Sequence, residues 1–323
     1  MPALQICYHD HCFDGVASAA TFLRFYRDKV KPGIADVALR GMAHRAGQLF
    51  PPDVFSGEEN AVVDFRFSAD PRLTWWFDHH QSAFETAADE ATFKADRSGR
   101  KFWDPAAKSC TRFIARIAEE KFGWDPTPLG ELIEWAEVID GALFPNPQMA
   151  VALTDPAMQL MLLIEASQDP GLRPRLIGEL AERQLSAVLR ERWVIDPLQP
   201  LLARHQEVVR LVTGRIRVDR GVATYDLADL GVDNVNKFIA YAADPATVYT
   251  VSVSRGTGRS KISLGSNPWK QHLRTHNLAR IAERYGGGGH PAVAAISFPP
   301  EQLEQARAAA AVIADELRQP QTA

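Results

Sequence analysis

The first half of the chain alternates between short apolar runs and stretches with helical spacing. Four apolar runs have the length and composition of buried strands, at residues 3–8, 35–39, 61–63 and 73–77. Residues 15–27 carry apolar side chains at helical spacing, and the same spacing recurs from Ser109 to residue 168. Strands that alternate with helices predict an α/β domain built on a mostly parallel sheet flanked by helices.

The pattern changes after residue 170. Residues 171–211 are helical in pattern and rich in arginine and glutamate, and Asp196-Pro197 predicts a break within them. Strand-type runs follow up to residue 266, and then the pattern predicts a helix, a strand and a helix at 277–285, 293–298 and 301–318. We therefore divide the chain into an α/β domain, a helical connector and a smaller α+β domain, over 1–170, 171–211 and 212–323.

Histidine and carboxylate residues cluster where three of the predicted strands end. HDHCFDG at 9–15 follows the first strand, VVDF at 62–65 contains Asp64, and FDHH at 77–80 ends the fourth. Strand ends carry the active-site residues of α/β sheets. Mixed imidazole and carboxylate donors suit Mn²⁺, Fe²⁺ or Zn²⁺ better than Mg²⁺ or Ca²⁺. Because the candidates exceed what one catalytic ion needs, the pattern predicts two ions that share a bridging carboxylate.

Each residue of these clusters also has an ordinary structural interpretation. His9 alone could be a hydrogen-bonded histidine at a strand end, Asp14 a helix start and Asp64 a turn residue. The FDHH run is different, because adjacent histidines after an aspartate at a strand end serve no packing purpose. Taken jointly, the three clusters favour a metal site.

Composition narrows the classes of function. The 323 residues carry a formal net charge of −4, whereas proteins that grip long DNA or RNA usually have a basic excess. Three cysteines make no disulfide framework, and no run reaches the ~20 apolar residues that span a bilayer. The N-terminus has no signal-type pattern. We therefore expect a cytoplasmic protein with no membrane association and no surface for long nucleic acids.

The segments HDHCFDG, VVD and FDHH, together with GGGGHP at 286–291, resemble the signature segments of the DHH phosphoesterase superfamily with its DHH-associated C-terminal domain. The resemblance covers both predicted domains, in order. Members with this layout include oligoribonucleases (nanoRNases), single-strand exonucleases, cyclic-dinucleotide phosphodiesterases and 3′-phosphoadenosine phosphate phosphatases. The resemblance implies a phosphoester hydrolase with two divalent metal ions, usually Mn²⁺, in a cleft between the domains.

The resemblance also implies roles for individual residues. His9 and Asp64 would hold one ion, and the other ion would be held by Asp14, Asp64, His79 and Asp140. Asp64 would then be the bridge. The alternative for Asp140, in EVIDG at 137–141, is an ordinary helix C-terminus. The implied catalytic pair is Asp78, which would orient an imidazole or the attacking water, and His80, which would donate a proton to the scissile phosphate or stabilise its charge.

Cys12 departs from the family pattern, because many relatives have a second aspartate at this position. A thiolate ligand there would favour Zn²⁺ or Fe²⁺ over Mn²⁺. Alternatively, Cys12 is a small buried residue, or Asp10 or His11 takes the place of the missing aspartate. We favour a spectator or weak ligand, so the identity of the metal stays open.

The glycines before His290 are the candidate substrate-binding segment of the second domain. Main-chain N–H groups without side chains can accept a phosphate, with His290 as a charged donor, so Gly287, Gly288 and Gly289 join the candidate site. Its alternative is a flexible turn. Gly265 stands where relatives often have an arginine, and the donors that could replace it are Arg259, Lys261 and Lys270.

We interpret the chain as a metal-dependent phosphodiesterase that hydrolyses short oligonucleotides or dinucleotides to mononucleotides by metal-activated water. The nearest alternatives are a nucleoside bisphosphate or polyphosphate phosphatase and a single-strand exonuclease. From a different class, the changes at Cys12 and Gly265 leave open a non-catalytic nucleotide-binding protein. The oligomeric state is also open, with a homodimer as one option.

Overall fold

The structure is a computed structural model that describes residues 1–43, 50–230 and 235–319. It contains two compact units. Unit 1 consists of Met1–Phe144 and Thr154–Leu202, and unit 2 of Pro145–Leu153 and Ala203–Ala323. The connector expected at 171–211 is therefore divided between the two units.

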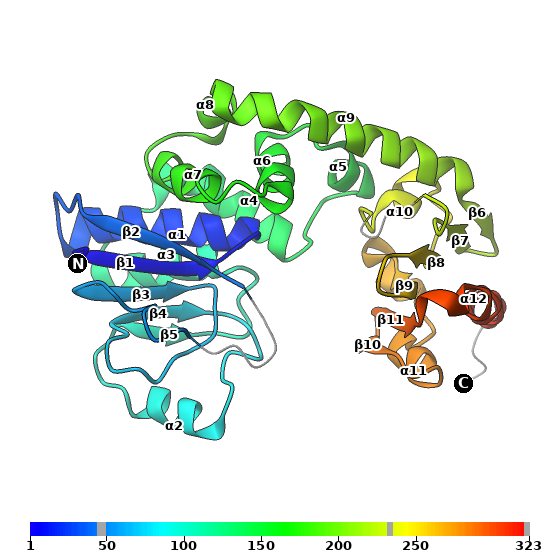
Figure 1. Cartoon of the computed structure of the whole chain (residues 1–323), viewed down its shortest axis with the longest axis horizontal. Helices are drawn as coiled ribbons and strands as arrows, with labels where there is room; N and C mark the ends of the chain where they lie inside the picture. Colours follow the sequence, from blue (N-terminus) through cyan, green and yellow to red (C-terminus); the bar gives the residue numbers. More distant parts are fainter. Residues whose placement is uncertain (44–49, 231–234, 320–323) are drawn as a thin grey trace. The chain divides into compact units, whose positions relative to one another are not determined.

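Unit 1 is built on a five-stranded sheet that is parallel throughout its described pairings, as the alternating pattern predicts. The strand order is β2-β1-β3-β4-β5 (Figure 1). The strands are β1 (Leu4–His9), β2 (Val37–Met42), β3 (Glu59–Val63), β4 (Trp75–Asp78) and β5 (Lys101–Trp103). The sequence does not predict β5, because its KFW run is short. In the structure, this strand is only half buried.

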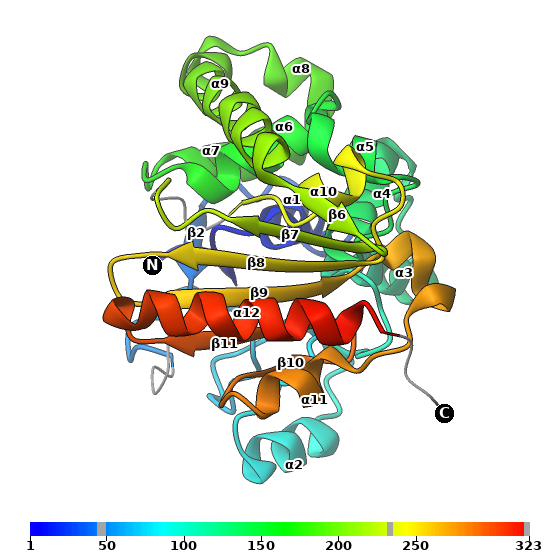
Figure 2. The ribbon, with the colours of Figure 1, turned by 90° about the vertical axis from the view of Figure 1, so that its right-hand side faces the viewer.

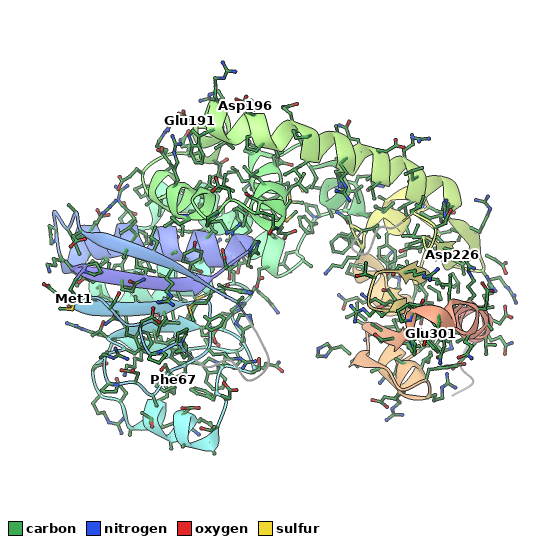
Figure 3. The ribbon with its side chains drawn as sticks, in the orientation of Figure 1. Met1, Phe67, Glu191, Asp196, Asp226 and Glu301 are labelled. Carbon is green, nitrogen blue, oxygen red and sulfur yellow. The ribbon has the colours of Figure 1, made fainter. Side chains whose placement is uncertain are left out.

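Both faces of this sheet are covered. One face packs against the main core of the unit, which includes apolar residues of the helices α1 and α3. The other face carries a second core rich in aromatic residues, including Phe67 (Figure 3), Trp76 and Phe93 of α2. The helical segments of unit 1 are α1 (Phe13–Phe25), η1 (Tyr26–Val30), α2 (Ala87–Ala95), α3 (Cys110–Phe122), η2 (Thr127–Leu129), α4 (Gly130–Asp140), α6 (Pro156–Ala166), α7 (Leu172–Leu180) and α8 (Leu185–Leu189).

The helix α9 (Arg192–Arg215) begins in unit 1 and ends in unit 2. It continues through Pro197 and Pro200, so the break predicted at Asp196-Pro197 is wrong. Val194 and Leu198 are fully buried in the core of unit 1, and this packing holds the helix together although each proline removes a main-chain hydrogen bond. Among the described residues, no helix is both long and apolar enough to cross a membrane.

Unit 2 has a mixed six-stranded sheet of order β10-β11-β9-β8-β7-β6, which confirms the predicted α+β class. The helices α11 and α12 contribute to the core on one face, and Figure 2 shows α12 along the sheet. Its strands are β6 (Arg217–Asp219), β7 (Val222–Asp226), β8 (Tyr249–Arg255), β9 (Ser260–Ser266), β10 (Gly288–His290) and β11 (Val293–Phe298). Its other helical segments are α5 (Pro147–Ala152), α10 (Ile239–Ala243), η3 (Pro268–Leu273), α11 (Leu278–Glu283), η4 (Pro300–Gln302) and α12 (Leu303–Leu317).

Candidate metal centre

Three strand ends of unit 1 bring the predicted ligands together. His9 is the last residue of β1, Asp64 directly follows β3, and Asp78 is the last residue of β4. Because these strands are parallel neighbours, their carboxyl ends lie at one edge of the sheet. Ligand atoms within 4.8 Å of one another form three groups there: His9 with Cys12 and Asp64, Asp64 with His79 and His80, and Asp14 with His79 and Asp140.

His79 lies among three carboxylates. Its Nδ1 is 3.1 Å from the main-chain oxygen of Ala107, so in the neutral ring the hydrogen belongs on Nδ1 and Nε2 is the acceptor. Nε2 lies 3.4 Å from Asp140 Oδ2, 3.5 Å from Asp64 Oδ1 and 3.8 Å from Asp14 Oδ2. The ring is thus oriented by the main chain, with its free nitrogen directed at the acidic groups.

The beginning of α3 fixes Asp14. Its carboxylate accepts hydrogen bonds from the main-chain N–H groups of Cys110 at 2.7 Å and Thr111 at 3.1 Å. These N–H groups are among those that an α-helix leaves without a partner at its N-terminus, and the helix dipole there favours a negative charge. Each oxygen accepts one such bond and keeps a lone pair for an ion.

Asp64 faces two ligand groups at once. Its side chain is buried, and its φ of +54° is a left-handed conformation that is uncommon outside glycine and concentrated at functional sites. Neither carboxylate oxygen has a hydrogen-bond partner in the part of the chain that the structure describes. Oδ2 lies 3.5 Å from His9 Nδ1, and Oδ1 lies 3.5 Å from His79 Nε2.

These distances suit divalent ions better than direct hydrogen bonds. Separations of 3.4 to 3.8 Å exceed those of a good N–H···O bond. Two atoms that each bind one ion at about 2.1 Å lie roughly 3 to 3.5 Å apart. An ion would also satisfy the buried oxygens of Asp64, which are costly to leave without a partner. The donor set therefore fits a pair of divalent metal ions.

Electrostatics within the cluster support the same conclusion. Burial, followed by the charges of Asp64 and Asp140, raises the pKa of Asp14 well above its usual range. Burial and the charge of Asp64 also raise the pKa of Asp140. Burial opposes a charge on His79, but Asp64 and Asp14 outweigh it and raise the pKa of His79 to about 10. Burial likewise opposes ionisation of Asp64, yet His79 and His9 lower its pKa overall. A divalent cation would relieve the repulsion among these acids.

Asp78 orients His80. Asp78 is fully buried, and its Oδ1 accepts the main-chain N–H of His79 at 2.8 Å and lies 2.6 Å from His80 Nδ1. This hydrogen bond holds the pKa of His80 above its ordinary value. Trp103 Nε1 donates to the main-chain oxygen of His80 at 2.9 Å. Asp78 therefore holds the ring of His80 and Trp103 holds its main chain, and Nε2 is the ring nitrogen that is not bonded to Asp78.

Cys12 immediately precedes α1 and lies beside two predicted ligands. Its Sγ belongs to the group formed with His9 and Asp64. Burial, followed by the charges of Asp64 and Asp14, raises the pKa of the Cys12 thiol well above its usual range when no ion is bound. The structure thus places the thiol beside the candidate ligands His9 and Asp64.

Gly15, the last residue of HDHCFDG, has a packing role beside His9. A Cβ at Gly15 would lie closer than 3.0 Å to the main-chain oxygen of His9. Only glycine therefore lets α1 begin this close to the end of β1. The glycine was visible in the sequence, but the close approach that requires it was not.

Arg173 is a residue that the sequence does not connect with the site. Its guanidinium is buried, forms an ion pair with Asp10 and lies 3.3 Å from His11 Nε2. It also donates to the main-chain oxygens of Ile164 and Ser167. Because it stands in a segment expected to be a connector, far along the chain, no motif links it to the loop between β1 and α1.

The glycine segment of unit 2 contains an edge strand. Gly288–His290 forms β10, which pairs antiparallel with β11. A Cβ at Gly287 or Gly289 would lie closer than 3.0 Å to main-chain atoms of β11, so packing explains these two glycines. A Cβ at Gly288 would meet open space, and His290 is exposed. Gly288 and His290 are therefore accessible to a ligand.

The structure does not bring Lys261 and Arg259 to His290. His290 pairs with Val293, which in turn pairs with Gly265 of β9. Lys261 lies four residues from Gly265 on the same strand, which corresponds to roughly 13 Å. Arg259 directly precedes β9, still farther along. These two cations therefore belong to a different part of the sheet from His290.

Gly265 has no room for the arginine that relatives often carry. A Cβ there would lie 2.7 Å from Thr250 Oγ1 and 2.8 Å from the hydroxyl of Tyr241. Both side chains are buried, and their oxygens are 3.3 Å apart. Lys270, the remaining candidate donor, is hydrogen-bonded to the main-chain oxygen of Pro245.

No family model and no curated protein matches the sequence, but solved structures match nearly the whole chain. A pGpG-specific phosphodiesterase, PggH from Vibrio cholerae, is 17% identical with a TM-score of 0.69, over 97% of this chain and 99% of that chain. A DHH domain described as a member of a family of ribosomal proteins is 13% identical with a TM-score of 0.54, over 98% and 88%. The Mn²⁺ complex of RecJ from Thermus thermophilus is 14% identical with a TM-score of 0.50, and the match covers 98% of this chain but 52% of RecJ. The resemblance to the DHH phosphoesterases is thus confirmed at the level of the fold.

Proposed function

We propose that this chain is a metal-dependent phosphodiesterase that hydrolyses short oligonucleotides or dinucleotides to mononucleotides. The observation that carries the proposal is the placement of Asp64, whose two buried oxygens face His9 in one ligand group and His79 in another. The similar structure of a pGpG-specific phosphodiesterase, matched over almost its whole length, supports this class of substrate. The net charge of −4 also favours a short substrate over a long nucleic acid.

Two metal positions follow from the ligand groups. His9 and Asp64, with Cys12 beside them, would hold one ion, and Asp14, Asp64, His79 and Asp140 would hold the other. When bound, such a pair of divalent ions activates water and neutralises the charge that develops on a phosphoryl group. Mn²⁺ is the first candidate, because it is the ion in the similar RecJ structure, and Zn²⁺ or Fe²⁺ are the alternatives.

His80 is the proposed proton donor of the chain itself. Asp78 holds its Nδ1 at 2.6 Å, which fixes the orientation of the ring and favours the protonated form. In that form, Nε2 can donate a hydrogen bond to a phosphate oxygen and a proton to the leaving oxygen. Asp78 acts through His80 and is therefore a positioning residue.

His290 and Gly288 are the proposed substrate contacts of unit 2. Both are exposed on the edge strand β10, where an imidazole and a main-chain N–H can bind a phosphate. Gly287 and Gly289 support this strand by packing on β11. Arg259 and Lys261 are proposed to contact a more distant part of the substrate, since they stand farther along the sheet.

The cellular compartment and the oligomeric state also remain predictions. Its three cysteines are free, which fits the reducing cytoplasm. We retain a homodimer as a prediction, to be checked by light scattering.

A substrate panel tests the proposal. The purified protein is incubated with Mn²⁺ and a 5′-phosphorylated dinucleotide, a longer single strand, a cyclic dinucleotide or a nucleoside 3′,5′-bisphosphate. We expect preferential conversion of the dinucleotide to mononucleotides, and loss of this activity in Asp64→Asn but not in Asp125→Asn, whose carboxylate lies in an exposed turn. Preference for another member would reassign the substrate. No turnover with Mn²⁺, Zn²⁺ or Fe²⁺ would leave a nucleotide-binding protein.

A further inference from the structure

The two metal positions differ in the chemistry of their ligands. The group of His9, Cys12 and Asp64 offers one nitrogen, one sulfur and one carboxylate. The group of Asp14, His79 and Asp140 offers one nitrogen and two carboxylates. Thiolate ligands select ions such as Zn²⁺ and Fe²⁺, whereas carboxylates suit Mn²⁺ and Mg²⁺.

Neighbouring residues that could replace Cys12 as a ligand are engaged elsewhere. The Asp10 carboxylate forms an ion pair with the buried guanidinium of Arg173 and accepts the main-chain N–H of His11. The imidazole of His11 is 3.3 Å from Arg173 and 3.7 Å from Asp10. Both side chains therefore lie against Arg173, and neither occurs in a ligand group among the described residues.

The other two cysteines belong to no ligand group among the described residues. Cys7 is buried in the aromatic core and donates to the main-chain oxygen of Val54. Cys110 is also fully buried and donates to the main-chain oxygen of Phe77. Cys12 differs from both, because its sulfur lies within 4.8 Å of ligand atoms of His9 and Asp64.

Asp64 provides independent evidence that an ion belongs beside Cys12. Its side chain is only 1% exposed, and neither of its oxygens has a hydrogen-bond partner within the described residues. The oxygen Oδ2 is directed towards His9, on the side of the Cys12 group. A buried carboxylate without a hydrogen-bond partner is costly, and a bound cation would stabilise it.

We propose that the metal centre is asymmetric: a thiophilic divalent ion (Zn²⁺, Fe²⁺ or Co²⁺) binds His9, Cys12 and Asp64, and a harder ion (Mn²⁺) binds Asp14, Asp64, His79 and Asp140. This inference rests on the proposed metal-dependent function and specifies its cofactors. Binding of the first ion forms a sulfur–metal bond, and the thiol proton is released to solvent. No oxidation or reduction takes place.

The first turn of α1 fixes the main chain at residue 12. Cys12 immediately precedes α1, and its main-chain oxygen accepts the N–H of Val16 at 3.2 Å. Gly15 holds the same turn against His9. The main chain of Cys12 is therefore fixed beside His9, and its sulfur lies within 4.8 Å of ligand atoms of His9 and Asp64.

Cobalt titration tests the sulfur–metal bond directly. Metal-free protein is titrated with Co²⁺, and the near-ultraviolet absorption that arises from thiolate-to-cobalt charge transfer is recorded. We expect this absorption in the wild type and in Cys7→Ser, and its loss in Cys12→Ser, in which Cys7 and Cys110 remain. Circular dichroism confirms that each variant is folded. An unchanged spectrum in Cys12→Ser would overturn the proposal.

Competition between metals tests the asymmetry. Metal-free protein is equilibrated with equal amounts of Zn²⁺ and Mn²⁺, and bound metals are measured after removal of free ions. We expect one of each per chain, and in Cys12→Asp an affinity for Zn²⁺ that is lower by roughly tenfold or more, since even residues that only support a ligand have effects of that size. An affinity for Zn²⁺ that is the same in the wild type and in Cys12→Asp would contradict the proposal. Because neither readout requires turnover, a thiolate signal without hydrolysis would reject only the proposed function, and hydrolysis without the signal would reject only the asymmetry.

Discussion

Gly15 packs directly against the main-chain oxygen of His9, with no space for a Cβ between them. This contact joins the first turn of α1 to the last residue of β1. The loop between them carries Cys12, and Asp14 stands one residue before the glycine. The position of three ligand candidates thus depends on the absence of one side chain.

We expect Gly15→Ala to damage the metal centre more than the fold. The added methyl group must push α1 away from His9, at a cost of about 1–3 kcal/mol in the free energy of unfolding. Affinity for metal and hydrolysis of a dinucleotide should both fall. Gly130→Ala is the control, because a Cβ there meets open space in a helical conformation and should stabilise the protein slightly. Urea unfolding and metal titration measure both effects, and normal metal affinity in Gly15→Ala would refute this role.

Arg173 should be important for both stability and metal binding. Arg173→Met removes the partner of Asp10 from a buried ion pair, which we expect to lower the free energy of unfolding by about 3 kcal/mol. Arg173→Lys should recover part of this loss. The loop that carries Cys12 would also loosen, so affinity for the first ion should fall even where the variant is fully folded. Arg192→Met, at an exposed position in α9, is the control. If Arg173→Met lowered stability but left metal affinity unchanged, the arginine would have only a structural role.

Replacement of His80 or Asp78 should affect turnover more than metal content. We expect His80→Gln to lower kcat by roughly 10²- to 10⁴-fold, which is the usual contribution of a positioned proton donor. Asp78→Asn should have a smaller effect, since it leaves the imidazole in place without its charged partner. Metal analysis of both variants, with Asp125→Asn as a control, separates this role from ligation. A normal kcat in His80→Gln would contradict the proposed proton transfer.

The pH dependence of Asp78→Asn follows from the raised pKa of His80. The hydrogen bond that the His80 ring donates to Asp78 favours the protonated ring, so the wild type keeps the proton donor up to a higher pH. Without the carboxylate, the pKa of His80 should fall, and the alkaline limb of the kcat profile should move to lower pH. An unshifted limb would mean that another group donates the proton.

Substitutions in the glycine segment of unit 2 should show which positions are needed for packing and which for substrate binding. Gly287→Ala and Gly289→Ala should destabilise the protein, because each Cβ would collide with main-chain atoms of β11. Gly288→Ala and His290→Ala should leave stability within ~0.5 kcal/mol, since both positions are exposed, but should raise KM for the dinucleotide. Thermal unfolding and steady-state kinetics measure the two effects. An unchanged KM in both Gly288→Ala and His290→Ala would remove this segment from the substrate site.

The sequence predicted the parallel sheet and the cluster at its edge because both depend on local patterns. Each ligand segment directly follows a short apolar run, and parallel neighbours place their ends together whatever their exact register. The mutual approach of Asp14, His79 and Asp140 could be stated as a consequence of the family resemblance, but its distances needed the structure.

The features that the sequence did not predict depend on contacts between residues that are far apart in the chain. Arg173 pairs with Asp10 from a distant part of the chain, and no local sequence pattern predicts such a pair. The prolines of α9 suggested a break, but the burial of Val194 outweighs their local preference. Likewise, the distance between Lys261 and His290 follows from strand register, which composition does not determine.

Hydrolysis by chelated and metal-restored protein is the most direct test of the metal-dependent phosphodiesterase. Bound ions are removed, and cleavage of a 5′-phosphorylated dinucleotide is followed before and after divalent metal is returned. We predict no hydrolysis by the metal-free protein, recovery in the wild type on addition of metal, and no recovery in Asp64→Asn. Hydrolysis that persists in the metal-free protein, or that metal restores in Asp64→Asn, would contradict the account.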